Sequence, residues 1–272
     1  EVWTRDRHIL KVQPVAEAPV NGISTCVKGK FGWDFVNSPN RLTTPLIREN
    51  GAFRPASWEE ALNRVAEGLR AVAHQHGGAA IGFIGSSKAS NEEAYLTQKI
   101  ARLIFGTNNV DNSSRYCQNP ATQGLFRTVG YGGDAGTLRD LQQTDLIITV
   151  GSNLAENHPV FASHIKQSHK HHGQKLLVVD PRKHEMAERA DCYLRIRPGT
   201  DMVWASAMAK YMFDHHYADD AFLAERVNDV DAYRASLAPF TLEMASEVTG
   251  LSVEALTEAA EMIGQANSAC IL

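Results

Sequence analysis

One cysteine stands where a polar loop gives way to an apolar, helix-like pattern. The segment 112–120 carries Cys117, with Arg115 two residues before it and Gln118 directly after it. A helix N-terminus and a nearby guanidinium both favour a thiolate, the form that binds a soft metal or attacks an electrophile. A free cysteine is more often a small buried hydrophobic residue, so spacing alone leaves a structural role open. Cys117 is the first candidate for a metal ligand.

Two further candidate segments follow short apolar runs. Gly151-Ser152-Asn153 directly follows the first of these apolar runs. Small side chains together with free backbone N–H groups form an arrangement that can hold a phosphate. A tight turn needs the same residue types for reasons of backbone geometry, so that interpretation stays open. Asp180-Pro181-Arg182 ends the next run, where Asp can accept two hydrogen bonds from a guanine or ribose and Arg can pair with phosphate. Asp180 could instead cap a helix beginning near His184.

The elements that must position these residues alternate between strand and helix. Apolar runs rich in β-branched residues predict buried strands at 80–85, 146–151 and 175–180. Helical periodicity predicts helices at 58–74, 92–105, 162–172 and 203–213, then an all-helical part over 217–268 that ends with an amphipathic helix at 253–263 and its capping residue Ser252. This order favours an α/β fold, a parallel Rossmann-like sheet with helices on both faces. We expect Gly85-Ser86-Ser87, Gly151-Ser152-Asn153 and Asp180-Pro181-Arg182 along one edge of a single sheet.

Composition limits the classes of protein. The chain has 272 residues, 43% of them hydrophobic and 21% charged, with a net charge of -4. This balance gives no reason to expect nucleic acid as a partner, and no apolar run approaches the roughly 20 residues that would span a membrane. The four scattered cysteines do not suggest a disulfide framework, so we expect a reducing, cytoplasmic location.

Five blocks in one order carry a family resemblance. They are 26–33 (CVKGKFGW), 91–93 (NEE), the Cys117 block, 151–159 (GSNLAENHP), and 179–182 (VDPR) followed by 198–201 (PGTD). Together they resemble the molybdopterin oxidoreductases of the dimethyl-sulfoxide-reductase family, and within it the formate dehydrogenase alpha subunits, over nearly the whole chain. The resemblance implies the domain 1–3 fold of formate dehydrogenase and DMSO reductase.

The resemblance also implies a domain organisation. Residues 1–50 correspond to the remnant of an N-terminal iron–sulfur domain, and residues 51–272 to the α/β domain that binds a molybdopterin dinucleotide. Cys26 aligns with the last of four ligands of a 4Fe-4S cluster, so the other three should lie upstream of Glu1. The alternating pattern of 1–15 predicts a half-buried hairpin, and no segment precedes it in this sequence to pair with its edge. Residues 269–272 look like the start of a buried strand. We therefore expect the chain to be the middle of a longer subunit.

The implied cofactor is a bis-molybdopterin guanine dinucleotide with molybdenum or tungsten, the metal being ligated by Cys117. Lys28 would lie between the cluster and the pterin, although a surface lysine is the ordinary alternative. Glu156 and His158 would order the loop near the cofactor, and Asp201 could be only a helix cap. The implied cofactor-binding residues are Lys28, Ser86, Lys88, Arg115, Gly151, Ser152, Asn153, Glu156, His158, Asp180, Pro181, Arg182, Gly199 and Asp201.

The implied reaction is the two-electron oxidation of formate, with electrons leaving through the pterin to the cluster near Lys28 and possible electron-transfer subunits as partners. The formate enzymes of the family carry a histidine directly after the metal ligand, whereas this chain has Gln118. The side-chain amide of glutamine cannot take up or release a proton at neutral pH, so the difference concerns the transfer of the proton during the reaction. The alternatives are another molybdenum enzyme such as a nitrate reductase, or a non-catalytic relative like the iron–sulfur subunit of complex I. We expect these 272 residues alone to be largely free of cofactor, because half a site binds weakly.

Overall fold

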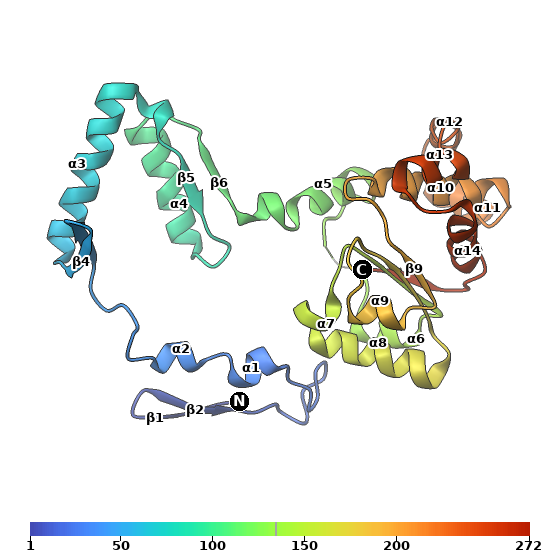
Figure 1. The fold of residues 1–272 in the computed structure, drawn as a ribbon, viewed down its shortest axis with the longest axis horizontal. Helices are drawn as coiled ribbons and strands as arrows, with labels where there is room; N and C mark the ends of the chain where they lie inside the picture. The colour runs from blue at the N-terminus through green and yellow to red at the C-terminus, as the bar shows by residue number, and fades with distance from the viewer. Residues whose placement is uncertain (134) are drawn as a thin grey trace. The chain divides into compact units, whose positions relative to one another are not determined.

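The computed structural model describes residues 1–133 and 135–272. The chain forms two compact units, which are described separately below. The first consists of Glu1–Trp33 together with Gly136–Leu272, and the second of Asp34–Ala135. Figure 1 shows the elements of both units in chain order. A domain boundary at residue 50 stays a prediction.

The first unit is built on a parallel sheet. Its strands are β7 (Leu146–Val150), β8 (Lys175–Val179), β9 (Cys192–Leu194) and β10 (Ala269–Ile271), in the spatial order β10-β7-β8-β9. The last residues of three strands are in register, because Val150 pairs with Val179 and Val179 with Leu194. The carboxyl ends of these strands therefore lie at one edge, and the strands predicted at 146–151, 175–180 and 269–272 are confirmed.

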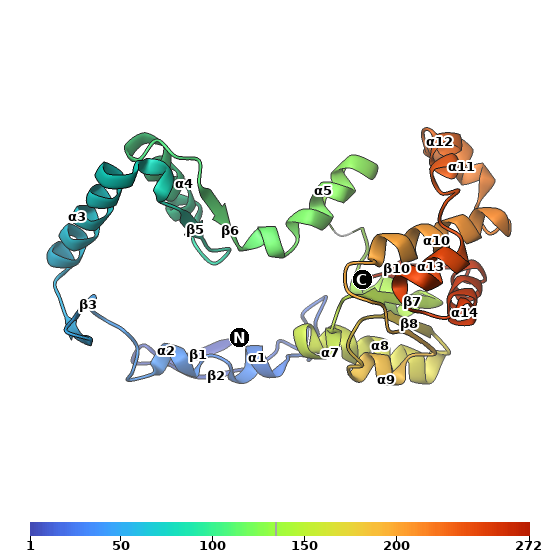
Figure 2. The same ribbon diagram turned by 45° about the horizontal axis from the view of Figure 1, so that its top comes forward.

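Helices pack on both faces of this sheet, as the sequence predicted (Figures 1 and 2). Side chains of β8 alternate between two buried clusters: Leu177 and Val179 join one, and Leu176 and Val178 join the other. The first cluster includes residues of α10 (Asp201–Asp214), α13 (Leu242–Thr249) and α14 (Val253–Gly264). The second includes residues of α6 (Leu138–Gln143), α7 (Leu154–Asn157), α8 (Pro159–His172) and α9 (Glu185–Arg189). Full burial of each such strand side chain contributes about 1.5–3 kcal/mol, so the sheet is held firmly from both sides.

Two further parts of the first unit agree with the sequence. Between β9 and β10 the chain is helical, with α11 (Asp220–Arg226) and α12 (Val230–Ser236) between α10 and α13. Ser252 caps α14, because its hydroxyl accepts the amide hydrogen of Ala255 at 3.2 Å. At the N-terminus, β1 (Val2–Arg5) and β2 (His8–Val12) pair as an antiparallel hairpin, followed by the short helix α1 (Val27–Phe31).

The second unit contains a long helix and several short elements. A hairpin precedes a long helix, and a parallel strand pair brackets another helix. In order they are α2 (Asp34–Asn37), β3 (Leu46–Glu49), β4 (Ala52–Pro55), α3 (Trp58–His76), η1 (Gly78–Ala80), β5 (Phe83–Gly85), α4 (Asn91–Lys99), the π-helical η2 (Ile100–Ile104), β6 (Val110–Asn112), η3 (Ser113–Tyr116) and α5 (Asn119–Thr128).

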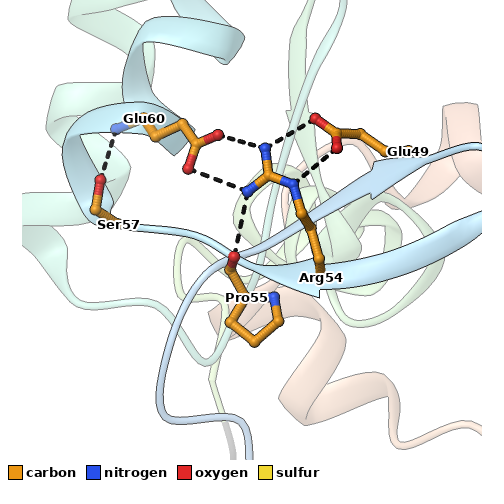
Figure 3. A network of polar contacts seen from close by, with 5 residues as sticks. All are labelled: Glu49, Arg54, Pro55, Ser57 and Glu60. Atoms are coloured by element: carbon orange, nitrogen blue, oxygen red, sulfur yellow. Dashed lines mark hydrogen bonds and ion pairs between the residues drawn. The ribbon is translucent and has the colours of Figure 1, made fainter.

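One guanidinium ties the β3–β4 hairpin to α3 (Figure 3). Arg54 of β4 donates to both oxygens of Glu49 on β3, each at 2.8 Å. It also donates to both oxygens of Glu60 in the first turn of α3, at 2.5 and 3.2 Å. These hydrogen bonds hold the pKa values of Glu49 and Glu60 below their usual range. Ser57 caps α3 next to this network, so hairpin and helix form one fixed corner.

The expectation of a single sheet is wrong. The strand predicted at 80–85 is observed as β5, and it pairs in parallel with β6 in a sheet of two strands. Ile84 in β5 is 89% exposed, whereas the two central strands of the four-stranded sheet, β7 and β8, are buried on both faces. Alternation of strands and helices predicts parallel pairing, but it does not specify which strands become neighbours. Ser86 thus belongs to the second unit, whereas the Gly151 and Asp180 segments belong to the first.

Candidate cofactor site

The turn after β7 leaves polar groups unpaired. Gly151 has φ = 62°, which glycine adopts without strain, and nothing lies within 4 Å of where a Cβ would stand. Its amide donates to the carbonyl of Val179 at 2.9 Å, so it is not free, contrary to the expectation. Among the described residues, the next two amides, of Ser152 and Asn153, have no hydrogen-bond partner. Two adjacent N–H groups beside open space suit an anionic oxygen.

Asn153 is the clearest sign of a missing ligand. The residue is 5% exposed, and neither its side-chain oxygen nor its side-chain nitrogen has a partner within the described part of the chain. The hydroxyl of Thr149, in β7, is buried and unpaired as well. An unsatisfied buried polar group costs about 1–3 kcal/mol, so native proteins usually supply a partner. These two side chains fit a polar group that binds from outside the chain.

The second strand end supplies a carboxylate. Asp180 follows β8 and its side chain is 8% exposed. Its Oδ1 accepts the amide hydrogen of Arg182 at 2.7 Å, and its carbonyl accepts the hydroxyl of Tyr193 at 3.0 Å. The cap position of α9 is occupied by His184, so Asp180 is not a helix cap. Pro181 and Arg182 are exposed at the same edge.

The loop after β9 adds a third segment at this edge. Gly199 has φ = 83°, again with open space where a Cβ would stand. Thr200 holds the cap position of α10, although its hydroxyl donates to the Arg197 carbonyl at 2.7 Å instead of capping the helix. Asp201 is the first helical residue, and it is exposed. Asp201 therefore does not cap α10, and its carboxylate is available to a ligand.

Lys28 connects α1 to the segment that follows the Gly151 turn. Its Nζ donates to the carbonyl of Asn157 at 2.9 Å and to that of Glu156 at 3.4 Å. Glu156 thus contacts Lys28 through its backbone carbonyl, while the Glu156 side chain is exposed. His158 holds the cap position of α8, and its ring lies 6.1 Å from that of Phe161. Lys28 therefore anchors this segment to α1, and the expected role of Glu156 and His158 near a cofactor stays a prediction.

Cys26 immediately precedes α1. Its thiol is partly exposed, and it is not in a disulfide. Hydrogen bonding from the backbone N–H of Gly29, together with a smaller contribution from that of Lys28, lowers the pKa of the Cys26 thiol. A lowered pKa favours the thiolate, which is the form that ligates iron.

The second unit gathers the remaining candidates at one strand edge of its own. Gly85 of β5 pairs with Asn112 of β6, so the loops after both strands leave the same edge. Ser86 and Lys88 lie on the first loop, where the Ser86 hydroxyl accepts the Lys88 amide hydrogen at 3.1 Å. Cys117 follows the second loop. The sequence did not reveal β6, because its three residues include only one apolar residue.

Cys117 lies between η3 and α5. Its thiol is exposed, and its amide donates to the Ser114 carbonyl at 3.1 Å. Gln118 holds the cap position of α5, so the predicted loop-to-helix transition is confirmed. Arg115 donates a hydrogen bond to Asp111 of β6, which lowers the pKa of that carboxyl. The guanidinium is therefore engaged with Asp111 and fixes the loop that carries the cysteine.

The described residues contain no group of three or more His, Cys, Asp or Glu side chains that could hold a metal ion. Cys117 would be a single protein ligand, and a metal bound there would take its other ligands from a cofactor. One hollow of the first unit, lined by residues such as Thr144, Asp145 and Gln174, lies at the amino ends of β7 and β8. It contains none of the candidate residues and is not the cofactor site.

Sequence comparison identifies the family. The family described as Molybdopterin oxidoreductase matches residues 41–269, and the Molybdopterin oxidoreductase Fe4S4 domain matches residues 1–38. The chain belongs to the molybdopterin oxidoreductase family.

Similar bacterial proteins match over all of this chain. One from Bacillus subtilis, named "Probable oxidoreductase YjgC", is 59% identical over 272 residues, and another, named "Putative formate dehydrogenase YrhE", is 58% identical. A Staphylococcus aureus protein, "Putative formate dehydrogenase SAUSA300_2258", is 54% identical over 271 residues. The chain spans 28% of the length of each of these relatives.

A solved structure supports the fold. The acetylene hydratase of Pelobacter acetylenicus matches with a TM-score of 0.73 at 23% sequence identity, covering 94% of this chain and 36% of that one. This confirms the predicted α/β fold. In the part of the chain that the structure describes, no helix is both long enough and apolar enough to cross a membrane.

Proposed function

We propose that this chain is the central part of the catalytic subunit of a cytoplasmic formate dehydrogenase. Its family is one of molybdopterin oxidoreductases, and the relatives named as formate dehydrogenases match the chain over all or nearly all of its length. The structural observation that carries the proposal is the carboxyl edge of the main sheet, where the buried side-chain amide of Asn153 has no hydrogen-bond partner among the described residues. Asn153 follows β7, and Asp180 follows the neighbouring strand β8.

The proposed cofactor is a bis-molybdopterin guanine dinucleotide with molybdenum or tungsten. When bound, this group supplies two-electron redox chemistry. The amides of Ser152 and Asn153 would bind a phosphate oxygen, and Arg182 would balance phosphate charge. Asp180 would accept hydrogen bonds from the guanine, while the open backbone at Gly199 would let the ligand approach closely. The further proposed contacts are Ser86, Lys88, Arg115, Gly151, Glu156, His158, Pro181 and Asp201.

A second proposed group is a 4Fe-4S cluster with Cys26 as one ligand. The lowered pKa of Cys26 supports thiolate ligation. Lys28 follows two residues later, and its ammonium is held by two carbonyls of α7. A fixed cation near the cluster stabilises added negative charge, so we assign Lys28 to the path of electrons out of the site. Separate electron-transfer subunits are the proposed partners.

Cys117 is the proposed protein ligand of the metal, with Gln118 beside it. Oxidation of formate yields carbon dioxide, one proton and two electrons. Gln118 can donate a hydrogen bond to a carboxylate substrate, but it cannot take up the proton at neutral pH. This supports a division of roles in which Gln118 orients the substrate and another group accepts the proton. The same feature keeps a second candidate open, a molybdopterin enzyme that reduces nitrate.

The deciding experiment uses the purified full-length enzyme. Formate-dependent reduction of an artificial electron acceptor is measured beside nitrate-dependent oxidation of a reduced dye, with metal analysis of the same sample. We expect formate activity that scales with molybdenum or tungsten content. Nitrate activity without formate activity would replace the proposed substrate, and an enzyme without either metal would contradict the cofactor.

A further inference from the structure

The strand end that carries Asp180 contains a second buried polar side chain with no role so far. The ring of His184 is 5% exposed, and neither of its nitrogens has a hydrogen-bond partner among the described residues. Its Nε2 lies 3.6 Å from Oδ2 of Asp180. Since a buried imidazole with both nitrogens unpaired costs free energy, this ring is positioned for a partner.

Asp180 is held on one side only. The amide of Arg182 donates to Oδ1 at 2.7 Å, whereas Oδ2 accepts no hydrogen bond from a described residue. A carboxylate with one anchored oxygen can still rotate. A contact shortened to about 3.0 Å would let the His184 Nε2–H donate to Oδ2.

We propose, resting on the function proposed above, that His184 is a positioning residue that makes Asp180 selective for guanine. Each carboxylate oxygen accepts two hydrogen bonds. With Oδ1 held by the Arg182 amide and Oδ2 by His184, one acceptor position on each oxygen stays open. Two open positions in a fixed plane match the N1–H and 2-amino donors of guanine. A base that lacks the 2-amino group leaves one of them unused.

The position of His184 in the chain supports this role. It caps α9, where its carbonyl accepts the Glu188 amide hydrogen at 3.0 Å, and the following residues Met186 and Ala187 are buried against the sheet. The backbone that carries the ring is therefore fixed relative to β8. Loss of the ring should change the orientation of the Asp180 carboxylate while leaving the strand end in place.

The test uses the full-length enzyme prepared in a host unable to make molybdopterin, with GMP and IMP as the probes. Calorimetry gives the affinity for each nucleotide. We expect GMP to bind more tightly than IMP. His184→Ala should weaken GMP binding roughly five- to tenfold, the effect of about one hydrogen bond, and weaken IMP binding less. His184→Gln, which keeps an N–H donor, should restore most of the preference.

A double-mutant cycle separates positioning from general damage. In an Asp180→Asn background, His184→Ala should have no further effect on the ratio of GMP to IMP affinity. Tyr193→Phe is the matched control, because it removes a hydrogen bond to the Asp180 carbonyl and leaves the carboxylate contacts intact. It should lower the melting temperature without changing that ratio.

The outcomes distinguish the two proposals. An unchanged ratio in folded His184→Ala, or an equal loss with and without the Asp180 carboxylate, overturns the role of His184 alone. If the unmodified protein does not prefer GMP and Asp180→Asn binds as before, the guanine site itself is wrong and the role of His184 falls with it.

Discussion

The ammonium group of Lys28 donates a hydrogen bond to the main-chain carbonyl of Asn157 at 2.9 Å, across 129 positions of the sequence. Lys28 lies within the part of the chain matched by the Fe4S4 domain, and Asn157 within the part matched by the molybdopterin oxidoreductase family. The bond therefore connects the two family regions directly, at the segment that follows the Gly151 turn.

Replacing Lys28 by methionine tests the proposed electron path. The hydrogen bond is exposed, so the free energy of unfolding should change by less than about 1 kcal/mol. Removing a cation near the cluster should lower its reduction potential by tens of millivolts, on the order expected for one charge at an effective dielectric of about 20. Redox titration followed by electron paramagnetic resonance measures the shift. Lys30→Met, on the same helix, is the control, and an equal shift there would argue against a specific role for Lys28.

Asn153→Ala should separate folding from cofactor binding. The substitution removes two buried, unpaired polar atoms, so the cofactor-free protein should be as stable as the unmodified one or more stable, by up to about 1–3 kcal/mol. Retention of the dinucleotide in the full-length enzyme should fall, because a polar partner is lost. Thermal melting of the cofactor-free form and nucleotide content after denaturation report the two effects. Destabilisation with full nucleotide content would show that Asn153 has only a structural role.

Cys117→Ser replaces a soft thiolate ligand with a weakly acidic hydroxyl. In the full-length enzyme we expect activity to fall by orders of magnitude while circular dichroism stays unchanged, since the side chain is exposed. Cys192→Ser serves as a comparison, because that thiol is buried and burial raises its pKa to about 11. It should affect stability more than turnover. Full activity in the Cys117 variant would end its assignment as metal ligand.

Gln118→His examines proton handling beside the metal ligand. The imidazole can accept a proton near neutral pH, which glutamine cannot. If Gln118 only weakens an inherited formate activity, the histidine variant should oxidise formate faster. The measurement is formate turnover across pH 6–9 at matched metal content. A fall in turnover would indicate that glutamine serves a different substrate or proton route.

Glu261 should make the first unit sensitive to acid. It accepts hydrogen bonds from the hydroxyls of Tyr211 at 2.5 Å and Tyr217 at 2.6 Å, which lower its pKa and raise that of Tyr211 to about 12. Because the folded-state pKa is depressed, the stabilisation is present above the unfolded value and is lost as the pH falls through the folded one. The difference in melting temperature between the unmodified protein and Glu261→Gln should therefore be largest above the usual titration range of a glutamate and should close as the pH falls below that range.

Glu258→Gln, one turn earlier in α14, is the control for this effect. Glu258 does not hydrogen-bond to either tyrosine, so its variant should not show a gap that closes with acid. The same closing gap in both variants would show that the acid sensitivity comes from the overall charge of the protein and not from the tyrosine pair.

Much of the first unit could be predicted from sequence, because its signals are local. The apolar runs at β7 and β8 are long enough to identify buried strands, and the residues that follow them mark the ligand edge. The capping signal at Ser252 is equally local. By contrast, β6 is too short and too polar to show a period, so the pairing that takes β5 into a separate sheet could not be seen.

In the candidate site, too, some features could be predicted from the local sequence and others could not. Gly151, Asp180 and Cys117 could be proposed from residue type and position. The contact of Lys28 with Asn157, the unpaired amide of Asn153 and the proximity of His184 to Asp180 depend on how distant segments pack or on which groups remain without partners. Such relationships have no counterpart in local sequence patterns.

The corner held by Arg54 offers a fixed attachment point for spectroscopic labels. The hairpin tip at Asn50 and Gly51 has positive φ at both residues, and the neighbouring Ala52 is exposed. Because Arg54 binds Glu49 and Glu60 together, a label introduced at Ala52 would follow the axis of α3 instead of swinging on its own tether. Paired with a second label on α8, it would turn the separation between the two units into a measurable distance distribution in solution.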